Sequence, residues 1–253
     1  MKNMKRILSA AAVFVLAGSM LAGCGSSSSD ENTLVMATNA TFPPYEYVEG
    51  DEIVGIDPEI AAAIAEELGM ELQIEDVEFD SIVAGVASGK YDMGMAGMTV
   101  DPERLESVNF SDSYATGIQS IIVKEGSPIQ SAEDLSAETL IGVQQGTTGA
   151  MYAADDYGQD AVVNFNKGAD AVQALVTDKV DCVIIDNEPA KSFVEANPGL
   201  KILDTEYAVE DYAICVAKDN DELLDKINDA LAKLKEDGTL DEIINKYIPS
   251  DGE

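Results

Sequence analysis

Residues 54–77 read VGIDPEIAAAIAEELGMELQIEDV, and this stretch decides the fold class. Its first part has the chemistry of a helix, because Asp57 can cap it, Pro58 suits the first helical position and Gly69 can close the last turn. Its second part, residues 70–77, alternates apolar and polar side chains as a strand does. A helix that leads directly into a strand is typical of α/β folds.

The same alternation continues on both sides of this stretch. Further strands are predicted at 33–38, 91–97, 140–143, 162–165, 181–186 and 212–217. Helices or helical turns are predicted to start at Asp80, Asp101, Ser131, Gly146 and just after Asp186, and to cover 167–179, 220–238 and 240–247. Strands that alternate with helices predict an α/β fold with largely parallel sheets.

Two long segments interrupt this pattern. Residues 114–123 and 207–217 are extended and show no helical spacing. Two extended crossings in one chain favour two lobes that are joined twice. The expected boundaries are 33–116 plus 214–248 for the first lobe and 117–213 for the second.

The N-terminus has the three zones of a secretory signal. A basic start is followed by an apolar run at residues 7–16, and then by the string LAGC at residues 21–24. LAGC resembles the lipobox of bacterial lipoproteins, which implies cleavage after residue 23 and diacylation of Cys24. The rival interpretation is an ordinary secretory signal with an incidental cysteine. The lipobox predicts an extracytoplasmic protein with a lipid anchor in the cell membrane.

A flexible tether is expected to follow the anchor. Residues 25–29 read GSSSS, within a predicted tether over residues 24–32. Cleavage leaves 230 of the 253 residues, enough for one large domain or two lobes. No second apolar run long enough to span a bilayer follows.

The composition excludes several classes of function. The net charge of −33 becomes −36 once the three basic residues of positions 1–23 are removed, and such acidity repels nucleic acid and anionic lipid surfaces. The acidic residues are scattered, so most are expected on the solvated surface. Histidine is absent, which excludes histidine-based triads and the common His/Cys zinc sites. No metal and no cofactor are expected.

Two cysteines remain after Cys24, in the apolar runs DCVIID and YAICVA. Cys182 and Cys215 are expected to be buried free thiols that act as small hydrophobic side chains. A disulfide between them stays open as an alternative in an oxidising compartment.

Several ordered blocks carry a family resemblance. They are ATNATFPPYEY (37–47), VGIDPEIAAAIAEELG (54–69), MAGMTVDPERLESVNFSDSY (95–114), IGVQQGTTG (141–149) and DCVIIDNEPA (181–190). With them the chain resembles the amino-acid-binding receptors of ABC importers, the family 3 extracellular solute-binding proteins, over nearly all of residues 33–248. The resemblance implies two α/β lobes with a two-strand hinge that close on a free amino acid. It also implies a monomer that delivers its ligand to permease subunits in the membrane.

The resemblance also implies roles for single residues. A free α-amino acid presents a carboxylate and an ammonium, which need a planar cation and an anion shielded from water. By the family pattern Arg104 clamps the carboxylate, and Thr148 donates to it from the second lobe. Asp186 pairs with the ammonium. For Arg104 the rival is a surface arginine, for Thr148 a helix cap, and for Asp186 a helix cap.

Other expected ligand contacts lie in the same blocks. Gly97, Met98 and Thr99 lie where a strand gives way to a helix, and such strand ends bind ligands in α/β sheets. Gly97 can offer its carbonyl to the ammonium, and Thr99 its hydroxyl and amide. Phe42 and Phe79 match aromatic positions that flank the ligand side chain.

Three positions bear on selectivity. Asn39 stands where family members selective for basic or amide side chains often carry aspartate. Gln144 stands where some members carry lysine or leucine, and Ile185 where a glutamine receptor has histidine. The departure at Asn39 favours a neutral polar amino acid, with a basic one still open.

Two rival functions remain. Some proteins of this fold are cyclohexadienyl-type dehydratases, but the chain offers no histidine and no clear general acid beyond scattered carboxylates. An amino-acid-sensing co-receptor is the other alternative. The expected function is therefore capture of an extracellular amino acid, with no enzymatic activity.

Overall fold

The computed structural model describes residues 32–204 and 206–249, which belong to one compact unit. The predicted signal peptide, Cys24 and all but the last residue of the predicted tether lie outside the described residues.

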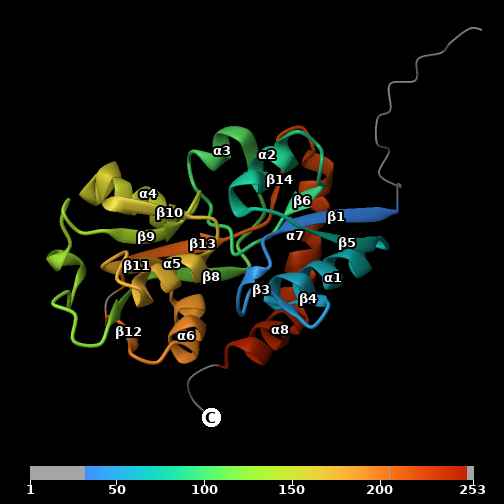
Figure 1. Cartoon of the computed structure of the whole chain (residues 1–253). Coiled ribbons are helices and arrows are strands. Elements are labelled where there is room, and N and C mark those ends of the chain that lie inside the picture. Colours follow the sequence, from blue (N-terminus) through green and yellow to red (C-terminus); the bar gives the residue numbers. More distant parts are fainter. Residues whose placement is uncertain (1–31, 205, 250–253) are drawn as a thin grey trace, which may run out of the picture. The chain divides into compact units, whose positions relative to one another are not determined.

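The strands form two main sheets whose neighbours are far apart in sequence (Figure 1). The first sheet has the order β5 (Glu71–Asp76), β1 (Thr33–Thr38), β6 (Met93–Gly94), β14 (Cys215–Ala217) and β7 (Val108–Phe110). The second has the order β10 (Val162–Phe165), β9 (Ile141–Gln144), β11 (Cys182–Asp186), β8 (Ala115–Lys124) and β12 (Leu200–Ile202), and β13 (Ala208–Tyr212) also pairs with β8. A small third sheet holds β2 (Thr41–Phe42), β3 (Glu46–Glu49) and β4 (Glu52–Val54).

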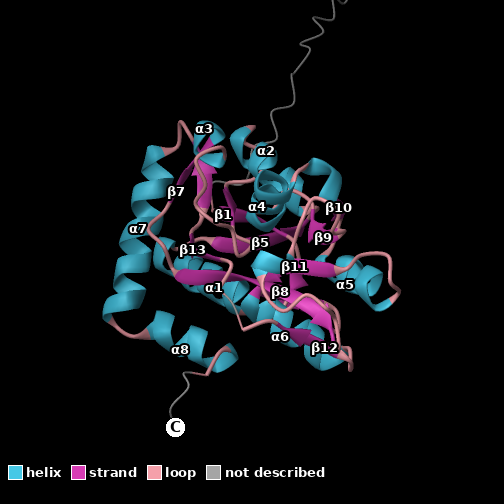
Figure 2. Cartoon of the chain, turned by 90° about the vertical axis from the view of Figure 1, so that its left-hand side faces the viewer, coloured by secondary structure: helices cyan, strands magenta, loops and turns pink. Residues whose placement is uncertain are grey.

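Helices cover both faces of each main sheet (Figure 2). The first sheet is accompanied by α1 (Ile56–Leu68), α2 (Ile82–Ala87), α3 (Arg104–Ser107), α7 (Asp221–Glu236) and α8 (Thr239–Tyr247). The second is accompanied by α4 (Thr148–Tyr157), α5 (Gly168–Val176) and α6 (Asn187–Ala196). Short 3-10 helices occupy Phe79–Ser81, Ala132–Asp134 and Gln159–Ala161.

The second sheet shows why its strands read as continuous apolar runs. Along β11, Cys182 and Ile184 join the core cluster that contains α4, whereas Val183 and Ile185 join the cluster that contains α5. Successive side chains of a strand point to opposite faces, so a sheet with helices on both faces buries every residue. This explains the run DCVIID, in which only the last five residues form the strand.

The two extended segments lie side by side. β8 pairs antiparallel with β13, from Ala115 opposite Tyr212 to Gln119 opposite Ala208. β8 then continues into the second sheet, and the chain after β13 enters the first sheet as β14. The structure is thus the predicted two-lobed α/β fold with two extended crossings.

Two predicted helix caps are wrong. The α1 helix begins after Gly55, and Asp57 is its second residue, with a carboxylate that accepts hydrogen bonds from elsewhere in the fold. Asp80 lies in a 3-10 turn and accepts a hydrogen bond from Gln145 instead of capping α2. Both acids are therefore drawn into tertiary contacts that sequence periodicity does not show. The predicted strand at 91–97 also shrinks to two residues.

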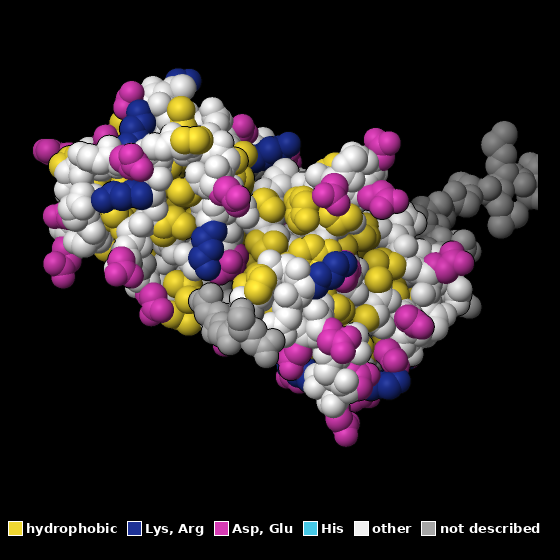
Figure 3. Space-filling model, turned by 90° about the horizontal axis from the view of Figure 1, so that it is seen from below, with side chains coloured by type: hydrophobic (Ala, Val, Ile, Leu, Met, Phe, Trp, Pro, Cys, Tyr) yellow, Lys and Arg dark blue, Asp and Glu magenta, His cyan; other side chains and the backbone are white. Residues whose placement is uncertain are grey.

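The cysteines and the charge follow the expectations. Cys182 and Cys215 are buried free thiols, and burial raises the pKa of each to about 12. Acidic side chains are spread over the face in Figure 3 and do not gather in one block.

Candidate functional site

A small cavity of about 20 Å³ lies where loops of the two main sheets meet. Its lining residues come from both sheets and from the small third sheet: Asn39, Phe42, Glu46, Phe79, Ala96, Gly97, Thr99, Arg104, Gln144, Thr147, Thr148 and Asp186. The cavity thus brings together every residue predicted to bind the ligand except Met98.

Arg104 begins the α3 helix and is only 6 % exposed. The Asp101 carboxylate accepts from the backbone N–H of Arg104 at 3.2 Å, which fixes the start of this turn. The guanidinium donates from Nη1 to the carbonyl of Thr99 at 2.8 Å and from Nη2 to the carbonyl of Gly146 at 2.9 Å. Among the described residues no carboxylate forms an ion pair with it. Burial lowers the pKa of Arg104 below its ordinary value.

Two adjacent threonines have different roles at the start of α4. Thr147 is the cap, and its hydroxyl accepts from the N–H of Ala150 at 3.2 Å. Thr148 is therefore free of the capping role that was its rival interpretation. Its hydroxyl lies 3.4 Å from that of Thr99, which comes from the other main sheet's side of the cavity. These two hydroxyls connect the segment after β6 of the first sheet with the segment after β9 of the second sheet.

Asp186 ends β11 and is 7 % exposed. It occupies the cap position of α6 but makes no side-chain capping bond. Instead its carboxylate accepts from the Tyr212 hydroxyl and, at 2.9 Å, from the side-chain amide of Gln119. Burial raises the pKa of Asp186 to about 7. A carboxyl group with this pKa becomes fully ionised when a cation binds beside it.

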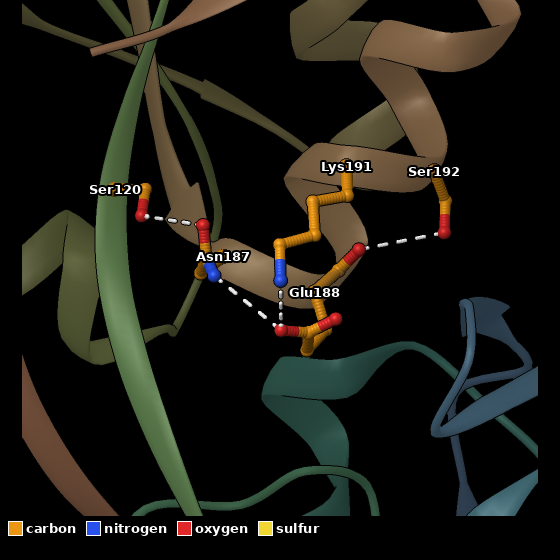
Figure 4. Close-up of polar contacts among 5 residues, drawn as sticks. All are labelled: Ser120, Asn187, Glu188, Lys191 and Ser192. Carbon is orange, nitrogen blue, oxygen red and sulfur yellow. Dashed lines mark hydrogen bonds and ion pairs between the residues drawn. The ribbon is translucent and has the colours of Figure 1, made fainter. Parts of the chain in front are cut away.

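The chain after Asp186 is held to β8 by polar contacts (Figure 4). The Ser120 hydroxyl lies 3.4 Å from the Asn187 side-chain oxygen, and the Asn187 amide donates to Glu188 at 3.4 Å. Lys191 donates to the same Glu188 oxygen at 2.6 Å. These contacts help to fix the first turn of α6 and, with it, the end of the strand that carries Asp186.

A second group of polar residues is neutral. Gln144 donates its amide to the Asn39 side-chain oxygen at 2.9 Å and to the Asn166 carbonyl at 3.1 Å. Asn39 donates in turn to the Val77 carbonyl at 2.7 Å. Both donor groups are thus in use within the protein. Phe42 also lines the cavity.

The sequence analysis missed three residues that line the cavity, and it predicted one ligand contact, Met98, that does not line it. Glu46, Ala96 and Thr147 line the cavity, and no spacing in the sequence marks them. Met98 is fully buried in the core cluster that contains Ile82, and its side chain does not line the cavity. Gly97 and Thr99 line the cavity, and the chain bends at Gly97 with a φ of +50°, so local spacing does not show that Met98 between them enters the core.

Within the described part of the chain, no group of three or more acidic or cysteine side chains is arranged to hold a metal ion. In the same residues, no helix combines the length and the apolar character needed to cross a membrane.

Comparison with known proteins gives the family. The family model for bacterial extracellular solute-binding proteins, family 3, matches residues 34–250. The chain is 36 % identical over 238 residues to the arginine-binding extracellular protein ArtP of Bacillus subtilis, covering 90 % of this chain and 92 % of that protein.

Two solved structures of ancestral arginine-binding proteins are also similar. The one bound to glutamine has 39 % identity and a TM-score of 0.82, covering 87 % of this chain and 100 % of the other. The one bound to arginine has 41 % identity and a TM-score of 0.80, covering 85 % and 98 %. All these relatives are binding proteins and none is an enzyme. The chain therefore belongs to the family 3 extracellular solute-binding proteins, among the amino-acid-binding members that serve ABC transporters.

Proposed function

We propose that this protein is a lipid-anchored receptor that captures a free α-amino acid with a polar side chain and delivers it to the permease of an ABC importer. The ligand carboxylate is bound by Arg104, Thr99 and Thr148, and the ammonium by Asp186 and the Gly97 carbonyl. We call Arg104, Thr99, Thr148 and Asp186 the anchor residues.

The observation that carries this proposal is the buried arginine without a counter-ion. Arg104 is 6 % exposed, lines the cavity and has no ion-pair partner among the described residues. An uncompensated buried charge costs several kcal/mol, so the site is completed by an anion from outside the chain. A carboxylate matches the planar donors of a guanidinium in two parallel hydrogen bonds. Asp186 supplies the opposite charge on the same cavity, which suits the zwitterion of an amino acid.

Closure of two lobes follows from where the anchor residues lie. In this proposal residues 33–116 and 214–248 form one lobe and residues 117–213 the other. Thr99 and Arg104 then belong to the first lobe, and Thr148 and Asp186 to the second. A ligand that contacts both lobes stabilises the closed arrangement relative to an open one.

Three lining residues bear on which side chain the ligand carries. Asn39, Gln144 and Glu46 offer polar atoms beyond those of the anchor residues, and we call them the selectivity residues. The similar ancestral proteins are described as bound to arginine and to glutamine. Both ligands have a long side chain with a polar tip, which supports a polar ligand here.

Membrane attachment is proposed from the LAGC string. Cleavage before Cys24 and diacylation of that cysteine would place the receptor on the extracytoplasmic face of the cell membrane as a monomer beside its permease. A tether raises the local concentration of receptor near the permease. Replacement of Cys24 by alanine is expected to release the protein into the soluble fraction and to abolish labelling by a palmitate analogue. Retention of the label in that variant would contradict the proposed lipid attachment at Cys24.

A thermal-shift panel of the twenty amino acids tests the binding function. A ligand that binds only the folded state stabilises it by mass action, and the melting temperature rises as a result. At a ligand concentration one hundred times Kd, the free energy of unfolding increases by about 2.7 kcal/mol. We expect a polar L-amino acid to give the largest rise and its D-enantiomer to give none. A flat response across all twenty would reject the proposed function.

A further inference from the structure

Glu46 is the cavity residue with the most unusual surroundings. It begins β3, is 1 % exposed and lines the cavity. Beside it lies Asp57, which is fully buried on α1. The second carboxylate oxygen of Asp57 accepts from the Gly97 N–H at 2.8 Å and from the Tyr114 hydroxyl at 3.0 Å. One oxygen of each residue, Oε2 of Glu46 and Oδ1 of Asp57, is buried without a donor among the described residues.

A shared proton explains these two orphan oxygens. The backbone N–H of Asp57 donates to the carbonyl of Tyr45 at 2.9 Å, which places Asp57 beside Glu46. Two buried carboxyl groups that lie next to each other can pair only if one of them carries a proton. Burial and the neighbouring acid raise the pKa of Glu46 well above its ordinary value, and burial raises the pKa of Asp57 to about 6. Glu46 is therefore the protonated member and donates to Asp57.

The other groups around Glu46 strengthen this conclusion. The charged neighbours that act on it are Asp57 on α1, Asp186 at the end of β11 and Asp76 at the end of β5, and all three are acids. Among the described residues no lysine or arginine forms an ion pair with Glu46. The negative charge of this region is thus compensated by a proton as long as no external cation is present.

Glu46 is the lining residue best suited to contact the ligand side chain. The anchor residues take up the ligand carboxylate and ammonium. The amide donors of Asn39 and Gln144 already donate within the protein. Of the three selectivity residues, Glu46 alone is titratable, and its Oε2 has no donor among the described residues.

We propose that Glu46 and Asp57 hold one proton between them in the ligand-free receptor, and that an amino acid with a cationic side chain binds beside Glu46 and displaces this proton. The inference rests on the proposed function and names its ligand class, a guanidinium or ammonium side chain. The proton leaves the Glu46 carboxyl group for the solvent, and the ligand's positive charge replaces it. A neutral polar side chain leaves the proton in place, so the two classes of ligand differ in the protons that they release.

Calorimetry of the wild-type protein with arginine and with citrulline measures this difference. Citrulline has nearly the shape of arginine but a neutral tip, and both present the same ammonium to Asp186. Titrations at pH 7 in phosphate and in Tris, whose ionisation enthalpies differ, give the number of protons released. We expect arginine to release about one proton more than citrulline. Arginine affinity should also rise with pH relative to citrulline affinity, because protons compete only with the cationic ligand.

Two variants on the same strand complete the test. Glu46→Gln should remove the difference in proton release and weaken arginine binding about tenfold or more, with citrulline affected by less than about threefold. Glu49→Gln removes an exposed acid three residues along β3 and should leave both affinities unchanged. Equal proton release for arginine and citrulline, or an unchanged arginine Kd in Glu46→Gln, would overturn the inference while amino-acid binding stands. Binding of no amino acid would instead overturn the proposed function and the inference together.

Discussion

The two charged anchor residues, Arg104 and Asp186, present charges without a counter-ion to the cavity, whereas the selectivity residues present groups that are already paired with one another or with a proton. Arg104 has no ion-pair partner among the described residues, and Asp186 is held only by neutral donors. Asn39 and Gln144 are hydrogen-bonded to each other, and Glu46 lies beside Asp57. The first group therefore gains much from any α-amino acid. The selectivity residues add binding free energy only when the ligand side chain interacts with them more strongly than their present partners do.

This difference predicts two kinds of variant. A change among the anchor residues should weaken every amino acid alike, because all share the carboxylate and the ammonium. A change among the selectivity residues should alter the order of preference among amino acids and leave the average affinity closer to that of the wild type.

Arg104→Ala is expected to have the largest effect. Loss of one partner of a buried charge pair costs about 3–5 kcal/mol, which raises Kd by roughly 150- to 4,000-fold for arginine and glutamine alike. Arg104→Lys keeps the charge without the two parallel donors, so its Kd should lie between those of the wild type and Arg104→Ala. Calorimetry of both variants measures this, and circular dichroism checks the fold. A loss confined to one amino acid would place Arg104 among the selectivity residues.

Asp186→Asn should weaken binding less than Arg104→Ala does. It should also show how much the buried carboxylate destabilises the ligand-free protein. Loss of a charged hydrogen-bond partner for the ammonium costs about 2–3 kcal/mol, or roughly 30–100-fold in Kd. The folded-state pKa of Asp186 is about 7, above its ordinary value of 3.8, so ionisation destabilises the ligand-free fold as pH rises through this window. The variant should therefore be more stable than wild type without ligand at pH 7.

Melting temperatures measured from pH 4 to pH 8 test this second part. The stability difference between Asp186→Asn and the wild type should grow with pH up to about pH 7 and then change more slowly. A difference that shrinks with rising pH would show that Asp186 is stabilised as an anion in the ligand-free protein.

Gly146→Ala tests the approach of the lobes at the anchor residues. A Cβ at Gly146 would lie 2.8 Å from the Asp80 Cβ and 3.1 Å from its Cα, across the two lobes. The backbone φ of +77° adds a strain of about 1 kcal/mol for alanine. We expect binding of all amino acids to weaken by roughly 10–100-fold in equilibrium titrations.

Gly126→Ala is the matched control for that clash. Gly126 has a similar φ of +79°, and nothing lies within 4 Å of an added Cβ. It should therefore lower the melting temperature through strain alone and leave Kd unchanged. If the two variants affected binding equally, contact at Gly146 would not limit closure.

Much of the fold could be predicted from sequence, and so could the meeting of Thr99, Arg104, Thr148 and Asp186 at one cavity. The strand at 33–38 and the helix of residues 56–68 have strong local patterns, and the structure confirms them. Arg104 and Asp186 lie at strand and helix ends inside recognisable blocks. What local pattern could not show is tertiary pairing. Asp57 looks like a helix cap until Gly97 and Tyr114, distant in sequence, are seen to donate to it.

The selectivity residues were harder for the same reason. Glu46 stands between two tyrosines in a segment without helical or alternating spacing, and only the folded chain brings it to Asp57. The side chain of Met98 was misplaced because a block of neighbouring residues does not show which of them faces the cavity. The strand there is shorter than predicted, and the chain bends at Ala96 and Gly97 before it reaches Met98.

Asn39→Asp should have the smallest effect and concern preference only. An acid at this position attracts a cationic side chain, but it loses the donor to the Val77 carbonyl and lies near the Asp76 carboxylate. We expect the ratio of arginine to glutamine affinity to rise by about threefold to tenfold, as measured by calorimetry of both ligands. An equal change for both ligands would mean that Asn39 contacts the part that they share.

The central claim is that the anchor residues bind the carboxylate and ammonium common to α-amino acids. Calorimetry of the wild-type protein with L-arginine and with agmatine, its decarboxylated form, and with L-glutamine and 4-aminobutanamide, tests it most directly. We predict that at least one of the two amino acids binds and that its decarboxylated partner binds at least about 10²-fold more weakly. Equal affinity for an amino acid and its decarboxylated partner would contradict the claim.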